Sequence, residues 1–299
     1  MDNIILNSSD HHKINLYLWK SKEPKAILHI FHGMREYALR YKPFAEFLVK
    51  NNYHVVIHDH RGHGESMLED KTGFFAKENG WEKIVYDIKV INDYLTEEFP
   101  NLDIFFLGHS MGSFILRDSI YALHDKIKVK GAIISGTGNP SKYLVNFGCF
   151  LTKLLLKFNK PNKPSKLLEK ISFFGYHKRF KNEEHGSWLT RDTEKLKEFK
   201  TYEYAFKYMP LIFYKDLYHG INRVIRDDFF NIDMPLFIIS GDEDPVGNYS
   251  KDVHNVIRKY SKYTEVSSHI YEGFRHEVLN EVGREVVYND IVNWLNQKR

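Results

Sequence analysis

The feature that most constrains this chain is the pentapeptide GHSMG at residues 108–112, which stands between two segments of different periodicity. Residues 104–107 form an apolar run typical of a buried strand, and after Ser110 the apolar side chains recur at the spacing of a helix. Gly-x-Ser-x-Gly in this context predicts a sharp, strained turn that exposes the serine hydroxyl, because glycines let neighbouring backbone approach closely. Ser110 is therefore the candidate nucleophile, and an idle serine in a tight glycine turn is the alternative interpretation.

Strand and helix patterns alternate on both sides of this turn. Buried strands and amphipathic helices are predicted in turn at residues 25–31, 41–50, 53–58, 81–95 and 129–134. A hairpin is predicted before them, from strands at residues 4–6 and 14–19. Late in the chain the alternation resumes with strands at 235–240 and 265–271 and helices at 248–260 and 283–295. This order predicts an α/β fold with a mostly parallel central sheet and helices on both faces.

The segment from residue 139 to residue 231 interrupts that alternation. It has helix-like patterns and dense aromatic side chains but no convincing buried strand, so we predict an inserted helical cap over a core of residues 1–138 and 232–299. Residues 143–158 are its most apolar part, with lysines within and after them. Two interpretations stay open here: a lid whose apolar side touches substrate or a membrane surface, and a helix packed on the sheet domain.

A second glycine motif follows the predicted strand at residues 25–31. His32-Gly33 at the end of a strand is where acyl-transfer hydrolases with such a serine turn place a backbone N–H that binds the oxyanion. Met34, the next residue, would supply that N–H group. The N–H of Met111, directly after the serine, would be its partner.

A serine hydroxyl is a weak nucleophile, so it needs a base and an acceptor that orients the base. Asp244 and His276 each lie in a loop directly after one of the two late strands, at the carboxyl edge where the serine turn is also expected. Serine, acid and histidine then follow in the α/β-hydrolase order. Asp244 is preferred because Pro245 fixes the turn after it, with Asp242 as the alternative acid. His269 lies inside a strand pattern and is interpreted as structural.

Composition narrows the classes of partner and compartment. The net charge of +4 is spread over interspersed basic and acidic residues, so no nucleic-acid partner is predicted. The single cysteine, Cys149, excludes an internal disulfide and is interpreted as a packing residue. The chain opens with polar residues rather than a basic and apolar leader, and it lacks an apolar run of about 18 residues. We expect a cytoplasmic location, and no particular oligomeric state is predicted.

Four histidines lie close together in sequence, and they raise the question of a metal site. They are His54, His58, His60 and His63. Their spacing lacks a helical i, i+4 pair with a third ligand, and glycines mark a loop. A hydrogen-bonded structural loop is therefore preferred, and neither a metal nor a cofactor is predicted.

Five segments of this chain resemble one known family. They are GMREYALRY at residues 33–41, DHRGHGES at 59–66, GHSMGS at 108–113, GDEDPVG at 241–247 and YEGFRHEVLNE at 271–281. Together they look like the monoacylglycerol lipase and lysophospholipase group of α/β-hydrolases, also labelled serine aminopeptidase-like.

The resemblance implies the α/β-hydrolase fold and a role for each matching residue. Ser110 would be the nucleophile, Asp244 and His276 its partners, and the N–H groups of Met34 and Met111 the oxyanion hole. One departure stands out, because many relatives have Gly-Glu-His after the oxyanion residue where this chain has Arg-Glu-Tyr at residues 35–37. That change would narrow or charge the mouth of the pocket.

The expected activity is hydrolysis of carboxylic esters with medium or long acyl chains, through an acyl-enzyme and without a cofactor. The expected partner is a small ester or lipid substrate. Two other functions stay open. An aminopeptidase would need a carboxylate for the substrate amine, for which Glu183 and Glu184 are candidates, although they also fit a solvated acidic turn. A binding module of the same fold without catalysis is the third hypothesis.

Overall fold

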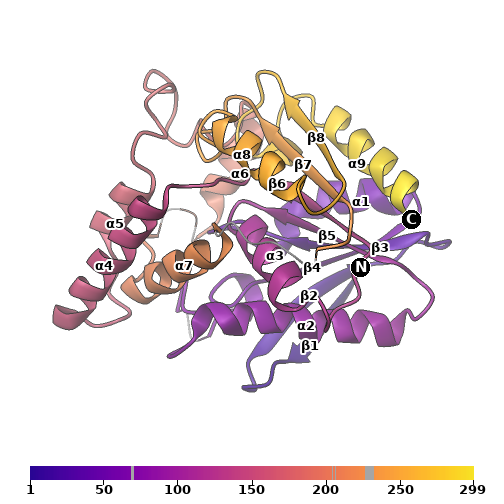
Figure 1. The fold of residues 1–299 in the computed structure, drawn as a ribbon, viewed down its shortest axis with the longest axis horizontal. Helices are drawn as coiled ribbons and strands as arrows, with labels where there is room; N and C mark the ends of the chain where they lie inside the picture. Colours follow the sequence, from indigo (N-terminus) through magenta and orange to yellow (C-terminus); the bar gives the residue numbers. More distant parts are fainter. Residues whose placement is uncertain (69–70, 204, 206, 226–231) are drawn as a thin grey trace.

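The computed structural model describes residues 1–68, 71–203, 205, 207–225 and 232–299. In these residues eight strands form one sheet in the order β1-β2-β4-β3-β5-β6-β7-β8 (Figure 1). The strands are β1 (Asp2–Asn7), β2 (Lys13–Trp19), β3 (Ala26–Phe31), β4 (Tyr53–His58), β5 (Ile104–His109), β6 (Gly131–Ser135), β7 (Leu236–Gly241) and β8 (Val266–Tyr271). The predicted α/β fold with a mostly parallel sheet is confirmed.

The strand order brings two loops together at the middle of the sheet. β3 pairs in parallel with β4 on one side and with β5 on the other, so the chain reverses its direction of travel across the sheet at this point. Loops that leave the carboxyl ends of β3 and β5 at such a switch point are neighbours in space. β2 runs antiparallel to both β1 and β4, which confirms the predicted opening hairpin.

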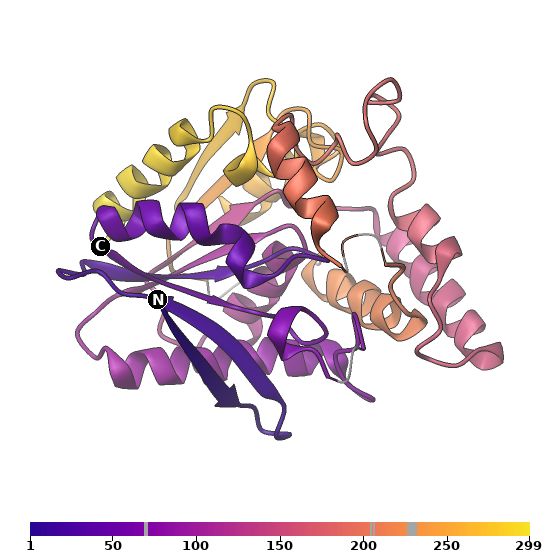
Figure 2. The ribbon, with the colours of Figure 1, turned by 180° about the vertical axis from the view of Figure 1, so that it is seen from behind.

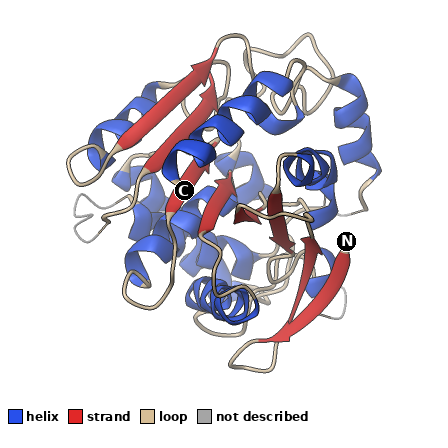
Figure 3. Cartoon of the chain, turned by 90° about the vertical axis from the view of Figure 1, so that its right-hand side faces the viewer, coloured by secondary structure: helices blue, strands red, loops and turns tan. Residues whose placement is uncertain are grey.

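Helices cover both faces of the sheet (Figures 2 and 3). Side chains of α1 (Lys42–Lys50) and α9 (Glu285–Lys298) belong to one buried cluster. Side chains of α2 (Gly80–Glu98), α3 (Met111–Ala122) and α8 (Lys251–Tyr260) belong to the other. Alternate residues of β3 enter the two clusters, which explains why the buried strands are largely apolar rather than alternating regularly with polar residues. Short 3₁₀ helices are η1 (Ala38–Tyr41), η2 (Gly64–Ser66) and η3 (Val278–Asn280).

The helices between β6 and β7 form a separate group, which we call the insert helices. They are α4 (Lys142–Phe158), α5 (Lys166–Ser172), α6 (Thr193–Thr201) and α7 (Leu211–Val224). α7 lies between the sheet domain and the outer pair α4 and α5 (Figure 1). The close approach of α4 to α7 uses Gly148, where a Cβ would lie 2.8 Å from the ring of Tyr218. The predicted domain division stays a prediction, and its last residues, 226–231, lie outside the described residues, as does Phe206 of the predicted aromatic cluster.

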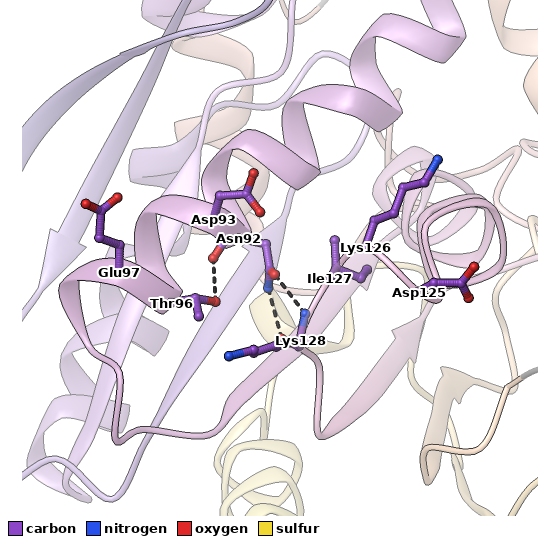
Figure 4. A pocket seen from close by; sticks show the side chains of 8 residues that line it. All are labelled: Asn92, Asp93, Thr96, Glu97, Asp125, Lys126, Ile127 and Lys128. Atoms are coloured by element: carbon purple, nitrogen blue, oxygen red, sulfur yellow. Dashed lines mark hydrogen bonds between the residues drawn. The ribbon is translucent and has the colours of Figure 1, made fainter.

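The lengths of the helices and one surface pocket complete the description of the fold. Among the described residues, none of the helices combines the length and the apolar character needed to cross a membrane. A shallow pocket of about 350 Å³ lies between the end of α2 and residues 125–128 before β6 (Figure 4). None of the candidate site residues lines this pocket, and it lies near the amino end of β6, opposite the loops that follow β3 and β5.

Candidate active site

Ser110 occupies a strained turn between β5 and α3. Its φ of 52° and ψ of −119° lie in a region that non-glycine residues rarely adopt, at a cost of about 1–3 kcal/mol. The glycines on either side are required by space, since a Cβ on Gly108 would lie 2.5 Å from the carbonyl oxygen of Gly112. A Cβ on Gly112 would lie 2.2 Å from the carbonyl oxygen of Phe31. The turn has the geometry that the pentapeptide predicts.

The loop after β3 lies directly against this turn. A Cβ on Gly33 would lie 3.2 Å from the Cβ of Ser110. The Gly33 N–H donates to Oε2 of Glu36 at 2.6 Å, and the Gly33 carbonyl accepts from Nδ1 of His32 at 2.7 Å. The Gly33 carbonyl belongs to the peptide unit that carries the Met34 N–H, so its bond with His32 fixes the direction of that group. In the described part of the chain, no protein acceptor binds the N–H of Met34 or of Met111.

Asp244 and His276 form a buried pair in the loops after β7 and β8. Nδ1 of His276 donates to Oδ2 of Asp244 at 2.9 Å, and both side chains are almost fully buried. Asp242, the alternative acid, instead accepts from the N–H of Gly273 at 2.7 Å. His269 lies on the edge strand β8, half exposed, with Nδ1 2.9 Å from the carboxylate of Asp290. The geometry therefore favours Asp244 and His276 over both alternatives.

Burial and charge act in opposite directions on His276. Burial alone lowers the pKa of its imidazole, but the charge and hydrogen bond of Asp244 act against it, and the resulting pKa lies above the ordinary value of 6.5. The neighbouring ring of His109 is also buried, and its pKa falls to about 4. A protonatable imidazole therefore lies beside one that stays neutral.

The Ser110 turn and the His276 pair are neighbours. The ring of His276 lies 4.7 Å from the ring of His109, the residue before Ser110. Gly136, with a φ of 57°, makes room for both rings, because a Cβ there would lie 3.1 Å from Cε1 of His276. No hydrogen bond joins the Ser110 hydroxyl to His276 among the described residues, and such bonds often tighten only when substrate binds.

A buried ionic network that the sequence did not predict joins two loops. One is the loop after β3 (residues 32–37), which we call the oxyanion loop after the role predicted for Met34, and the other is the loop after β8. Arg40 donates from Nε to Oε1 of Glu36 at 3.2 Å and from its guanidinium to Glu277, the residue after His276. Tyr41 donates to the other Glu36 oxygen at 2.7 Å. Burial raises the pKa of Glu277, whereas for Glu36 the effect of burial is outweighed by nearby charges and hydrogen bonds, which lower its pKa. The i, i+4 spacing of Glu36 and Arg40 was the available signal.

The buried histidines form a hydrogen-bonded chain behind the oxyanion loop. Nε2 of His29 meets Nδ1 of His58 at 2.9 Å, and Nε2 of His58 meets Nδ1 of His60 at 2.9 Å. The backbone N–H of His60 donates to Nε2 of His32 at 3.0 Å. The ring proton of His32 therefore lies on Nδ1, which faces the Gly33 carbonyl. Burial lowers the pKa of all four rings. No group of three or more potential metal ligands occurs among the described residues.

A segment of the insert covers His276. The ring of Trp188 lies 5.3 Å from the His276 ring, and its carbonyl accepts the His276 N–H at 3.4 Å. Glu183 and Glu184, the candidates for binding a substrate amine in an aminopeptidase, each form an ion pair with a basic side chain. Glu183 receives two hydrogen bonds from Arg275, at 2.8 and 2.9 Å, and Glu184 pairs with Lys200.

The chain is similar in fold and sequence to known lipases. A lipase solved in an open form superimposes with a TM-score of 0.89 at 23% identity, covering 99% of this chain and 98% of that one. Monoacylglycerol lipase of Mycolicibacterium smegmatis is 24% identical over 286 residues, or 91% of this chain and 89% of that protein. Human monoglyceride lipase is 35% identical over 98 residues, a match that spans 32% of this chain and 31% of the human protein.

The fold places the chain in the α/β-hydrolase class. A profile of the family described as serine aminopeptidase, S33 (Hydrolase_4), matches residues 22–283. The chain belongs to that family.

Proposed function

We propose that this protein is a serine carboxylic ester hydrolase of the monoacylglycerol lipase or lysophospholipase type, acting on esters with medium or long acyl chains. The observation that carries the proposal is the buried hydrogen bond between His276 and Asp244, beside the strained turn of Ser110. Asp244 keeps the proton of the imidazole on Nδ1, which leaves Nε2 able to accept a proton.

The reaction would follow from these roles. Oγ of Ser110 attacks the ester carbonyl while its proton passes to His276, and the N–H groups of Met34 and Met111 bind the oxygen that becomes negative. The tetrahedral intermediate then collapses, the C–O bond to the alcohol breaks, and His276 protonates the departing alcohol. Water, deprotonated by the same imidazole, releases the acid and restores Ser110.

The outer surface of the insert helices supports a lipid substrate and a peripheral membrane contact. Five large apolar side chains at helical spacing are 40–89% exposed along one face of α4: Tyr143, Phe147, Phe150, Leu154 and Phe158. Lysines at positions 153, 157, 160 and 163 lie in or after the same helix. Apolar side chains combined with lysines suit a surface with anionic head groups. The cysteine at 149 is free, in keeping with a reducing, cytoplasmic compartment.

Labelling of the serine is the direct test. A fluorophosphonate probe is expected to modify wild-type protein and not Ser110→Ala, and turnover of p-nitrophenyl esters and monoacylglycerols is expected to fall at least 10³-fold in that variant. Turnover of a series of esters with increasing acyl chain length would show which lengths the binding pocket accepts. Equal turnover by both proteins would contradict the proposal, and turnover of aminoacyl p-nitroanilides in place of esters would favour the aminopeptidase.

A further inference from the structure

Arg35, directly after the proposed oxyanion donor Met34, is held by the insert helices. Its φ of 63° places it in the left-handed region, which disfavours an arginine, and its side chain is only 10% exposed. Its guanidinium binds Glu169 of α5 and lies 5.7 Å from the ring of Phe173, the residue after that helix. The chain therefore places a strained, buried cation directly beside the proposed oxyanion donor.

The carboxylate of Glu169 also binds a second insert helix. Its Oε2, the oxygen that receives the guanidinium, accepts a hydrogen bond from the hydroxyl of Tyr214 in α7 at 2.7 Å. Tyr214 is fully buried, and burial together with the charge of Glu169 raises the pKa of its hydroxyl. One carboxylate therefore joins α5, α7 and the residue that follows the oxyanion donor.

The oxyanion loop thus has two kinds of anchor. His32 binds the Gly33 carbonyl and Glu36 accepts the Gly33 N–H, so they hold the peptides on either side of Gly33, and neither residue belongs to the insert. Arg35 holds the other side of Met34, and the partner of its guanidinium belongs to the insert. The contact with Glu169 therefore links the position of the insert helices to the backbone on the carboxyl side of Met34, whose N–H is the proposed oxyanion donor.

We propose that Arg35, through its ion pair with Glu169, is a positioning residue that aligns the Met34 N–H with the developing oxyanion when α5 and α7 are in place. The inference rests on the proposed function, since it gives the same oxyanion hole a dependence on the insert. Such a donor acts in the transition state, so misalignment lowers kcat and leaves substrate binding nearly unchanged. Complete loss of an oxyanion donor costs about 10²–10³ in kcat, and a misaligned donor costs part of that.

The test compares variants that keep the strained backbone and change only the charge. Arg35→Gln and Glu169→Gln are expected to lower kcat for p-nitrophenyl butyrate by about 10- to 100-fold with KM changed less than about threefold. Arg35→Lys, which keeps the cation, is expected to recover part of kcat. The double variant is expected to lose no more than either single variant, because both remove one interaction. Lys170→Gln, at an exposed position of α5, is the matched control and should behave as wild type.

Three results decide the proposal. Wild-type kcat in both single variants, with wild-type protein active, overturns it, and so does a rise in KM without a fall in kcat. If Arg35→Gln fails to fold, as judged by circular dichroism, Glu169→Gln decides in its place, and a kcat equal to wild type there overturns the proposal. A wild-type protein that neither hydrolyses esters nor reacts with a fluorophosphonate refutes the proposed function instead, so the two failures are distinguishable.

Discussion

The carboxylate of Asp244 sets the proton affinity of His276. Because Asp244 raises the pKa of the imidazole above 6.5 despite burial, the acid limb of kcat/KM is expected above pH 6.5 in wild-type protein. Below that pH the imidazole is protonated and no longer accepts the serine proton. In Asp244→Asn the carboxylate no longer opposes the effect of burial, so the pKa of His276 should fall and the acid limb should move to lower pH. The same variant is expected to lower kcat by about 10⁴-fold. A pH series of initial rates measures both effects.

A matched control for that series is Asp242→Asn. Its carboxylate binds the Gly273 N–H and does not contact the imidazole, so the position of the acid limb should stay at its wild-type value. An acid limb at or below pH 6.5 in wild-type protein would contradict the role given to Asp244. So would an equal displacement of the limb in both variants.

Arg40 is the cation between two buried carboxylates. Arg40→Met would leave Glu36 and Glu277 without their shared partner, so the free energy of unfolding is expected to fall by about 3–5 kcal/mol. Lys42→Met is the control, because its ion pair with Glu46 is more than half exposed and should contribute less than about 1 kcal/mol. Urea unfolding followed by circular dichroism gives both values, and similar losses in the two variants would refute the role of Arg40.

The proposed site residues that the sequence predicts are those whose position in the chain follows from the fold. Ser110, Asp244 and His276 each come directly after a predicted strand, so parallel pairing alone brings them to one edge. The link between Arg40 and Glu277 joins residues 237 positions apart, and nothing local signals it. The same holds for the contact of Arg35 with Glu169, across 134 positions.

At the scale of the element, the exposed apolar face of α4 leads us to predict that the protein binds to lipid vesicles. Replacing Phe147 and Phe150 with serine removes two exposed aromatic rings from that face, so binding to vesicles of phosphatidylcholine with phosphatidylglycerol is expected to weaken at least tenfold. Tyr86→Ser, an exposed aromatic of α2, is the control and should bind as wild type. Vesicle sedimentation measures the change, and p-nitrophenyl butyrate hydrolysis should be unaffected. Equal binding by all three proteins would contradict the membrane contact.

Helices and strands of the sheet domain were predictable because each has a clear period and a clear end. The start of α8 is the instructive difference, since a helix from residue 248 is predicted and the helix begins at Lys251. Asn248, Tyr249 and Ser250 all have positive φ, between 50° and 72°, which excludes helical geometry. Apolar periodicity does not reveal backbone of that kind, because the side chains keep a helix-compatible composition.

At the scale of the whole molecule, the sheet was more predictable than the insert. Parallel pairing fixes where β3, β5, β7 and β8 end relative to one another, so the site follows from the strand order. The insert helices pack through contacts such as that of the Gly148 backbone with the Tyr218 ring, which depend on geometry that apolar periodicity does not encode. The boundaries at residues 139 and 231 accordingly remain a prediction.

The insert divides the proposed catalytic residues into those that precede it in the chain and those that follow it, so they are synthesised at different times. Met34, Ser110 and Met111 lie before it, whereas Asp244 and His276 lie after it. A ribosome therefore completes the nucleophile and both oxyanion donors long before it adds the acid and the base. Under the proposed function, a chain that ends within the insert would lack both the acid and the base, and a proteolytic cut there would leave the nucleophile and its base on different fragments.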